Sequence, residues 1–305
     1  RNRESIGNDS GTGQPDGEKN SVKASGEYKK ALIRMVNHGT FCAEDKRKVW
    51  GVKMKYETYI FDLYGTLVDI HTEEEEKIVW EKLALFYGYY DAIYDADTLK
   101  KEFRRLIEQR EAGMQQDMKK KSDAHEAFPE VSIEEIFLEL FRQKGVPADE
   151  TLAIHAGQFF RVLTTDYIRL YPGAEDLLFS IKQAGGKLYL LSNAQRIFTE
   201  YELHTLGIAS YFDDIFISSS CGVKKPDAGF YQMLLEKHQI DVKTAVMIGN
   251  DAISDIAGAK GVGLSTFYIH SNISPELKGE IEADDVLLEM DLAEVKRRLL
   301  GDEKA

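Results

Sequence analysis

Four short, mostly apolar runs in this chain each end abruptly in polar residues, and longer amphipathic stretches separate them. An apolar run without alternation is typical of a strand that is buried on both faces of a parallel sheet. The four runs occupy residues 59–61, 187–191, 214–218 and 244–248. Open parallel sheets bind their ligands just beyond the carboxyl ends of the strands, so the polar residues that follow the runs are the candidate site.

The segment between the first and second runs is predicted to be helical. Thr72 followed by acidic residues 73–76 is typical of a helix N-terminus, where a hydroxyl caps and carboxylates face the positive end of the dipole. Four sets of apolar residues then recur at helical spacing. They are Ile78, Val79, Leu83 and Phe86; Leu99, Phe103, Leu106 and Ile107; Ile133, Ile136, Phe137, Leu140 and Phe141; and Leu152, His155, Phe159, Phe160 and Leu163. We predict a small helical bundle inserted after the first strand.

The polar residues that follow the four runs differ in chemistry. The first run ends in Asp62, and the chain then turns at Gly65. Burying a lone carboxylate is costly, so a cation, a metal or a hydrogen-bond donor is expected nearby. The other junctions carry, in order, a hydroxyl, a lysine and an acidic cluster: Ser192 with Asn193, Lys225 before Pro226, and Asn250 with Asp251 and Asp255.

This order of residue types resembles the four motifs of the haloacid dehalogenase superfamily, over roughly residues 54–288. The resemblance implies an α/β fold: a doubly wound, Rossmann-like parallel sheet as the core, with an inserted α-helical cap. The core is then expected at residues 54–70 and 171–305, and the cap at residues 71–170. Hinges are expected near Ile70 and Pro172-Gly173, where the cap would close over the site.

The resemblance implies a role for each polar residue at the junctions. Asp62 is the expected nucleophile, because a carboxylate can attack phosphorus or carbon to form a covalent intermediate. Thr66 and Ser192 would donate hydroxyl hydrogen bonds to a bound phosphate. Lys225 would offset the negative charge of the nucleophile and of the transferring group. The candidate catalytic residues are Asp62, Tyr64, Thr66, Ser192, Asn193 and Lys225.

A hard, oxygen-rich metal site is expected beside the nucleophile. Asp251 and Asp255 lie four residues apart at the start of a predicted helix and would share one face; with Asp62 they suit Mg²⁺, which takes few protein ligands and keeps waters. Asn250 stands where many members of the superfamily carry the first acid of this motif, so whether Asn250 or Asp251 ligates the metal stays open. The predicted cofactor is Mg²⁺, and the candidate metal ligands are Asp62, Tyr64, Asn250, Asp251 and Asp255.

The position two residues after Asp62 departs from the phosphatase pattern. Phosphatases of the superfamily usually carry a second Asp there, which protonates the leaving group, whereas this chain has Tyr64, a phenol with an ordinary pKa near ~10. The 2-haloacid dehalogenases of the superfamily also carry Tyr at this place, because a halide leaves without a proton. Those enzymes have a metal-free fourth motif and an arginine early in the cap, and this chain has no arginine between Asp62 and Arg104.

Three functions are therefore carried forward. The first is a Mg²⁺-dependent phosphatase that acts on a small phosphorylated metabolite through an aspartyl-phosphate intermediate. The second is a carbon–halogen hydrolase of the 2-haloacid dehalogenase type that uses the same aspartate. The third is a non-catalytic protein that binds a phosphate ligand or a partner, since Tyr64 has replaced the acid.

The net charge and the cysteine content limit the kinds of partner and the cellular compartment that we expect. A formal net charge of −13 argues against nonspecific binding to nucleic acid or to an anionic membrane surface. Only two cysteines are present, which fits the reducing cytoplasm, and no apolar run approaches the ~20 residues that span a bilayer. The expected partner is a small phosphorylated substrate, and the oligomeric state is not indicated.

The first 53 residues differ from the rest of the chain. Residues 1–27 are rich in small polar and charged residues, with almost nothing to bury, so they are predicted to be disordered. Met54 lies just before the first strand, at the distance where many members of the superfamily begin. Trp50-Gly51 must be encoded by a purine-rich tract, which is typical of a bacterial ribosome-binding site. Residues 1–53 are therefore expected to be either translated upstream sequence or a genuine extension.

Overall fold

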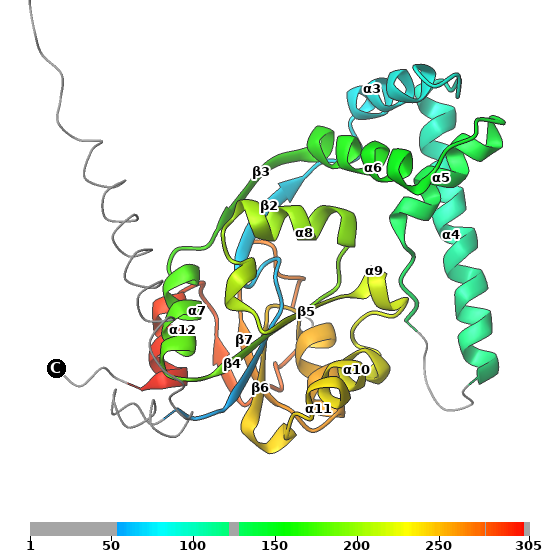
Figure 1. Ribbon diagram of the computed structural model, residues 1–305. Helices are drawn as coiled ribbons and strands as arrows, with labels where there is room; N and C mark the ends of the chain where they lie inside the picture. The colour runs from blue at the N-terminus through cyan, green and yellow to red at the C-terminus, as the bar shows by residue number, and fades with distance from the viewer. Residues whose placement is uncertain (1–53, 122–127, 278, 302–305) are drawn as a thin grey trace, which may run out of the picture. The chain divides into compact units, whose positions relative to one another are not determined.

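A six-stranded parallel sheet forms the centre of the protein in the computed structural model, which describes residues 54–121, 128–277 and 279–301 (Figure 1). Its strands are β1 (Thr58–Phe61), β4 (Lys187–Ser192), β5 (Asp214–Ile217), β6 (Ala245–Gly249), β7 (Ser265–Ile269) and β8 (Asp285–Leu287). They lie in the order β5-β4-β1-β6-β7-β8. The predicted doubly wound parallel sheet is confirmed. The expectations for residues 1–53 lie outside the described residues.

Alternate side chains of each central strand pack on opposite faces of the sheet, as the two-residue repeat of a strand requires. In β1, Tyr59 and Phe61 join one hydrophobic cluster, whereas Ile60 joins another. All three are fully buried. Burial on both faces explains why the central strands read as uninterrupted apolar runs.

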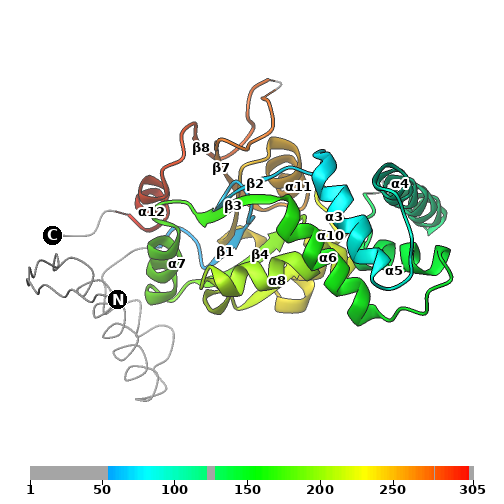
Figure 2. The ribbon, with the colours of Figure 1, turned by 90° about the horizontal axis from the view of Figure 1, so that it is seen from above.

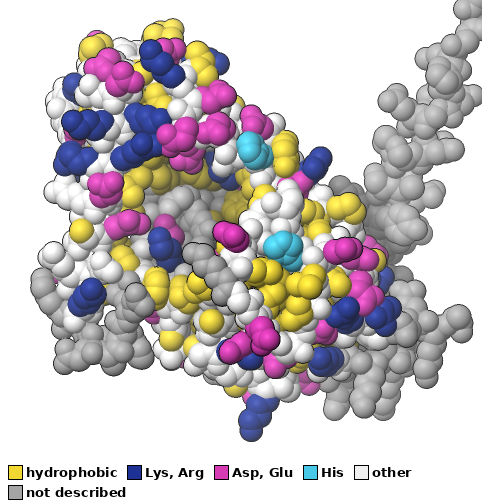
Figure 3. Space-filling model, turned by 180° about the vertical axis from the view of Figure 1, so that it is seen from behind, with side chains coloured by type: hydrophobic (Ala, Val, Ile, Leu, Met, Phe, Trp, Pro, Cys, Tyr) yellow, Lys and Arg dark blue, Asp and Glu magenta, His cyan; other side chains and the backbone are white. Residues whose placement is uncertain are grey.

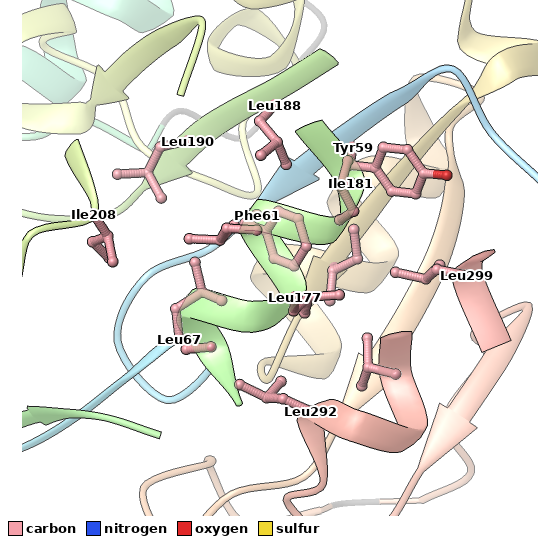
Figure 4. Close-up of a cluster of buried hydrophobic side chains, with 14 of the residues drawn as sticks. Tyr59, Phe61, Leu67, Leu177, Ile181, Leu188, Leu190, Ile208, Leu292 and Leu299 are labelled. Atoms are coloured by element: carbon pink, nitrogen blue, oxygen red, sulfur yellow. The ribbon is translucent and has the colours of Figure 1, made fainter. Parts of the chain in front are cut away.

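Helices cover both faces of this sheet. The first cluster receives residues from α7 (Ala174–Gln183), α8 (Arg196–Thr205) and α12 (Leu292–Leu300), and Figure 4 shows part of it, with Leu177, Ile181, Leu292 and Leu299 against Tyr59 and Phe61. The second cluster receives residues from α10 (Ala228–His238) and α11 (Gly258–Gly261). Both views place α7 and α12 on one side of the sheet and α10 and α11 on the other (Figures 1 and 2).

Short helical segments complete the connections of the core. They are α9 (Ser218–Cys221), the 3₁₀ turns η1 (Ala209–Tyr211) and η2 (Val242–Thr244), and the π-helix η3 (Ala252–Ala257). The last of these directly follows β6, so it begins at the carboxyl edge of the sheet.

Four helices follow the first strand, as predicted: α3 (Lys77–Gly88), α4 (Ala96–Lys121), α5 (Ile133–Gln143) and α6 (Glu150–Thr164). They have a hydrophobic core of their own, which includes Trp80, Phe103, Phe137 and Phe160. Their rings lie 5.3–5.7 Å apart, a spacing at which aromatic pairs attract one another.

The ends of this helical segment differ from the prediction. Two strands, β2 (Val68–Thr72) and β3 (Thr165–Leu170), form an antiparallel ribbon that leads into and out of the helices. Thr72 is therefore the last residue of a strand and not a helix cap, and α3 begins at Lys77. Asp69 fastens the ribbon, because its buried carboxylate accepts from Arg169 at 2.7 and 2.9 Å and from Asn272 at 3.0 Å.

The strand order brings the four polar junctions together. The strands β5, β4, β1 and β6 are consecutive neighbours, and they are parallel, so the loops that follow them leave from one edge. The chain runs from β1 outward to β5 on one side and then returns to β6 on the other. Reversals of this kind are where open α/β sheets bind ligands.

The surface of the described residues mixes charges of both signs. On the face drawn in Figure 3, acidic and basic side chains are interspersed among hydrophobic ones. Within the described ranges, none of the helices combines the length and the apolar character needed to cross a membrane.

Candidate active site

Asp62 lies immediately beyond β1, at the edge that the neighbouring loops share. Its backbone N–H donates to the carbonyl of Ile248 in β6 at 2.9 Å, and the residue is 7% exposed. The side chain receives three donors. Lys225 Nζ at 2.7 Å and Ser192 Oγ at 3.4 Å reach its Oδ1, and Thr66 Oγ1 lies 3.5 Å from its Oδ2. The structure therefore supplies the donors that a buried carboxylate at this position requires.

Lys225 places a buried ammonium group between two carboxylates. Its Nζ lies 2.7 Å from Asp62 and 2.7 Å from Asp255. Burial alone would lower the pKa of Lys225, but the carboxylates of Asp255 and Asp62 raise it above its ordinary value, so the amine stays charged. The adjacent Lys224 instead pairs with Glu111 at 3.6 Å, with a partly exposed side chain. The structure brings Lys225, and not Lys224, to the predicted nucleophile.

Replacing Lys225 with Met is expected to lower the free energy of unfolding by about 3–5 kcal/mol, because two buried carboxylates would lose their cation. Lys224→Met is the matched control, and its partly exposed ion pair predicts a loss within about 1 kcal/mol. Urea denaturation of both variants at neutral pH checks the comparison. Equal losses in the two variants would contradict the view that Lys225 compensates the buried charge.

Asn193 contacts the backbone of Lys225 and not the carboxylate of Asp62. Its Oδ1 accepts from the Lys225 N–H at 2.8 Å, and its Nδ2 donates to the Lys225 carbonyl at 2.9 Å. This pair of hydrogen bonds ties the loop after β4 to the loop that carries the lysine. Asn193, predicted among the catalytic residues, is placed as a residue that positions Lys225.

The buried carboxylate of Asp255 accepts hydrogen bonds from the backbone of the loop after β6. Its Oδ2 accepts from the backbone N–H groups of Asn250 and Asp251, both at 3.0 Å, while its Oδ1 accepts from Lys225. The residue is 1% exposed, and burial raises the pKa of Asp255 to about 7, with Lys225 opposing the rise and Asp62 adding to it. Asp255 therefore contacts both the backbone of the fourth junction and the ammonium group of Lys225.

The side chains of Asn250 and Asp251 contact different parts of the site. The Asp251 carboxylate accepts from the first backbone N–H groups of η3, at 2.8 and 3.1 Å, and so caps that helix. Asp251 is the residue that precedes the helix and Asp255 is buried within it. The two stay neighbours, because the Asp255 N–H donates to the Asp251 carbonyl at 3.0 Å. Asn250 lies beside the loop after β1, with its Oδ1 3.4 Å from the Thr66 hydroxyl.

Two glycines permit this close packing. Gly65 has φ +83°, and a Cβ there would lie 2.1 Å from Asn250 Nδ2. At Gly249, a Cβ would lie 2.3 Å from the Asp255 carboxylate. A side chain at Gly65 would separate the loop after β1 from the loop after β6, and one at Gly249 would displace the Asp255 carboxylate.

Tyr64 makes its hydrogen bonds to α8 and not to Asp62. Its hydroxyl donates to the Glu202 carboxylate and lies 3.0 Å from Thr199 Oγ1. Arg161, from α6, pairs with Glu202 at 2.7 Å and lies 5.9 Å from the centre of the Tyr64 ring. Burial, with the charge of Glu202, raises the pKa of Tyr64 well above its ordinary value. The phenol therefore keeps its proton and directs it to a carboxylate.

The donor set beside Asp62 consists of oxygens. Within the described residues there is no group of three or more His, Cys, Asp or Glu that could hold a metal ion, in keeping with the engagement of Asp251 and Asp255. The Oδ2 of Asp62 and the Oδ1 of Asn250 flank one hydroxyl, that of Thr66, at 3.5 and 3.4 Å. Mg²⁺ is bound in proteins by one or two carboxylates and keeps several waters, and carbonyl oxygens also suit it, so this set fits Mg²⁺.

Sequence reasoning missed the partners of Tyr64. Glu202, Thr199 and Arg161 lie far from Tyr64 along the chain and belong to ordinary amphipathic helices. An ionisable residue on such a helix is most often solvated, so nothing in the sequence separated Glu202 from its neighbours. The one available signal was the presence of a large phenol at a position where a small acid was expected.

The fold and this arrangement define a hydrolase class that is built on an aspartate at the end of the first strand. The family model of haloacid dehalogenase-like hydrolases matches residues 56–263, which is more than half of the chain. The protein therefore belongs to the haloacid dehalogenase-like hydrolase family.

Curated relatives include several phosphatases. The chain is 34% identical to a phosphoglycolate phosphatase of Vibrio cholerae over 122 residues, 38% of this chain and 54% of that protein. It is 30% identical to a phosphoserine phosphatase of Thermus thermophilus over 162 residues, 53% of this chain and 63% of that protein. It is also 29% identical to haloacid dehalogenase-like hydrolase domain-containing protein 3 of Xenopus laevis over 154 residues, 50% of this chain and 63% of that protein. The matches thus span less than two thirds of each of these relatives.

Solved structures share the fold. A 2-haloacid dehalogenase from Pseudomonas syringae aligns with 80% of this chain and 99% of its own, with a TM-score of 0.53 and 19% identity. A HAD phosphatase from Thermococcus onnurineus aligns with 81% of this chain and 100% of its own, with a TM-score of 0.50 and 20% identity. At these identities the likeness concerns the fold alone.

Proposed function

We propose that the protein is a Mg²⁺-dependent phosphatase that hydrolyses small phosphorylated metabolites through a phosphoryl group carried on Asp62. The observation that carries the proposal is the buried Asp62 carboxylate held 2.7 Å from the Lys225 ammonium, with the hydroxyls of Ser192 and Thr66 beside it. The family match and the phosphatase names of curated relatives support it.

The proposed reaction has two displacements. A carboxylate oxygen of Asp62 attacks phosphorus, the bond from phosphorus to the leaving oxygen breaks, and the leaving oxygen takes a proton from solvent. Water then attacks the phosphorus of the acyl phosphate, which releases inorganic phosphate and restores Asp62. Lys225 offsets the charge of the nucleophile and the phosphoryl oxygens, while Thr66 and Ser192 donate hydrogen bonds to them.

Asp62 and Asn250 are the proposed side-chain ligands of Mg²⁺, and Tyr64 would contribute its backbone carbonyl because its phenol is engaged with Glu202. When bound, the ion would neutralise charge on the phosphoryl oxygens. Asp255 and Asp251 would shape the site through Lys225 and through the cap of η3. This assignment chooses Asn250 over Asp251 as the ligand.

The helical segment is proposed to act as a cap domain over residues 71–170, on a core of residues 54–70 and 171–305. Its separate hydrophobic core and its entry and exit through the β2–β3 ribbon support this division. The hinges near Ile70 and Pro172-Gly173 stay a prediction; Ile70 lies within β2, and Pro172 follows the end of β3.

Removal of Mg²⁺ by EDTA is expected to reduce phosphate release by about 10²-fold or more, because such an ion supplies several kcal/mol of charge stabilisation. The measurement is a screen of aryl phosphates, phosphorylated metabolites and 2-haloacids, each with Mg²⁺ and with EDTA, followed by Mg²⁺ add-back. Halide release that is indifferent to EDTA would overturn the proposal in favour of dehalogenation, which Tyr64 specifically favours. Ligand binding without any turnover would indicate the non-catalytic alternative.

A further inference from the structure

The residues just before α5 lie against the loop that carries Lys225. Residues 128–132, called here the strap, pair with that loop through their backbone. The Lys224 N–H donates to the Phe128 carbonyl at 2.9 Å, and the Glu130 N–H donates to the Gly222 carbonyl at 3.1 Å. An isolated antiparallel bridge joins Pro129 to Val223. A part of the helical segment is therefore fixed to the chain immediately before the catalytic lysine.

The Glu130 carboxylate joins two further loops of the sheet edge. Its Oε1 accepts from Gln195 Nε2 at 2.9 Å, and its Oε2 accepts from Ser218 Oγ at 3.0 Å. Gln195 belongs to the loop after β4, whereas Ser218 begins α9 after β5. Gln195 also donates to the Val131 carbonyl and accepts from the Ile133 N–H, both at 3.0 Å. One carboxylate from the helical segment thus binds two motif-bearing loops at once.

The same two loops hold Lys225 in place. Ser218 Oγ, fully buried, accepts from the Ala194 N–H at 2.9 Å. The next residue back, Asn193, makes both hydrogen bonds to the backbone of Lys225. An unbroken series of contacts therefore runs from Glu130 through Ser218, Ala194 and Asn193 to Lys225, and each is a hydrogen bond of ordinary length or a peptide bond.

We propose that Glu130 is a positioning residue for the reaction, which acts by joining the loops after β4 and β5 so that Lys225 is held between Asp62 and Asp255. The inference rests on the proposed function only in that Lys225 acts on the transferring group. Glu130 has two side-chain oxygens, and each accepts from a different loop, so one residue can fix both loops. A misplacement of catalytic groups by about 1 Å can cost about 10²-fold in rate.

Glu130→Ala is expected to lower kcat by about 10- to 100-fold, with a smaller change in KM. The amides of Ala194 and Lys225 should exchange hydrogen faster in the same variant. Glu130→Gln is expected to retain most of both properties, because its carbonyl can accept from Gln195 while its NH₂ donates to Ser218. Rescue by the amide would show that hydrogen bonding, and not charge or bulk, is what matters.

Glu134→Ala is the matched control. Glu134, in the first turn of α5, is a buried carboxylate four residues further along the chain, but it pairs with Arg196 at 2.9 Å. Its loss should affect thermal stability without the kcat effect and without faster exchange at Ala194 and Lys225. Gln195→Ala removes the same hydrogen bond by deleting the side chain that donates to Glu130. It should reproduce the effects of Glu130→Ala, and it tests the proposal if Glu130→Ala fails to fold.

Kinetics test the proposed phosphatase activity, and hydrogen exchange tests the positioning role of Glu130 independently of it. If no phosphate ester is turned over by the parent, the proposed function fails, and the exchange of Ala194 and Lys225 still decides whether Glu130 holds the loops. Unchanged exchange at both amides in Glu130→Ala and Gln195→Ala would overturn the positioning role. An effect of Glu134→Ala on kcat equal to that of Glu130→Ala would also overturn it.

Discussion

Replacing Asp62 with Asn is expected to lower kcat by about 10⁴-fold or more, the scale of loss that follows removal of a covalent catalyst. The amide has nearly the same shape but cannot attack phosphorus. It should also fit the structure, because Lys225 keeps its contact with Asp255 at 2.7 Å when the charge at Asp62 is gone. We therefore expect folded protein with a circular dichroism spectrum like that of the parent and almost no turnover of an aryl phosphate.

Asp69→Asn provides the control for this experiment. Asp69 is also a buried aspartate, 3% exposed, but its carboxylate is held by Arg169 in the β2–β3 ribbon. Its replacement should lower thermal stability and leave most of kcat. If Asp62→Asn keeps turnover within about tenfold of the parent, a different nucleophile must operate, since loss of covalent catalysis cannot be that small.

Alkyl phosphates are expected to react about 10²–10⁴-fold more slowly than aryl phosphates, because general acid catalysis of the leaving group is worth that much. An aryl oxide leaves readily without a proton, whereas an alkoxide does not. Tyr64 stands at the position of the usual acid, but its raised pKa and its hydrogen bond to Glu202 prevent it from giving up a proton. The measurement is kcat/KM for matched aryl and alkyl esters.

Two variants of Tyr64 test the cause of this preference. Tyr64→Phe should leave the ratio of aryl to alkyl turnover unchanged, since the hydroxyl does not act in the reaction. Tyr64→Asp should narrow the ratio by raising alkyl turnover. Equal turnover of alkyl and aryl esters by the parent would mean that another residue is the acid, and our interpretation of Tyr64 would then be wrong.

The sheet and its polar junctions could be predicted because a strand that is buried on both faces consists of an uninterrupted apolar run, which is easily recognised in the sequence. Asp62 follows β1, Ser192 ends β4 and Lys225 lies in the loop that follows β5 and α9. Because these strands are neighbours in a parallel sheet, the three residues meet at one edge. The β2–β3 ribbon was missed for the opposite reason. Its strands, VDIHT and TDYIRL, contain no uninterrupted apolar run, and Thr72 with its acidic neighbours is equally typical of a helix start.

The orientation of side chains within the site could not be predicted. Asn250 and Asp251 are adjacent and both carry side-chain oxygens, and what distinguishes them is that Asp251 caps η3 while Asn250 contacts the loop of Gly65. Which of the two residues caps the helix depends on the residue at which the helix begins, and a sequence pattern does not locate that residue. The contacts of Glu130 and Glu202 join distant segments, for which hydrophobic periodicity carries no signal.

The central position of β1 also governs when the protein can fold during synthesis. In the complete sheet Thr58 lies opposite Lys187 on one side and Ala245 on the other. Both strands that pair with β1 are therefore synthesised long after β1 itself. An apolar strand with open edges invites pairing with other chains, and contacts this distant in sequence form slowly. The helical segment, whose contacts are local, is made in that interval and can fold first. Nascent chains arrested before residue 245 should therefore carry a folded helical segment, an unpaired β1 and a need for chaperones.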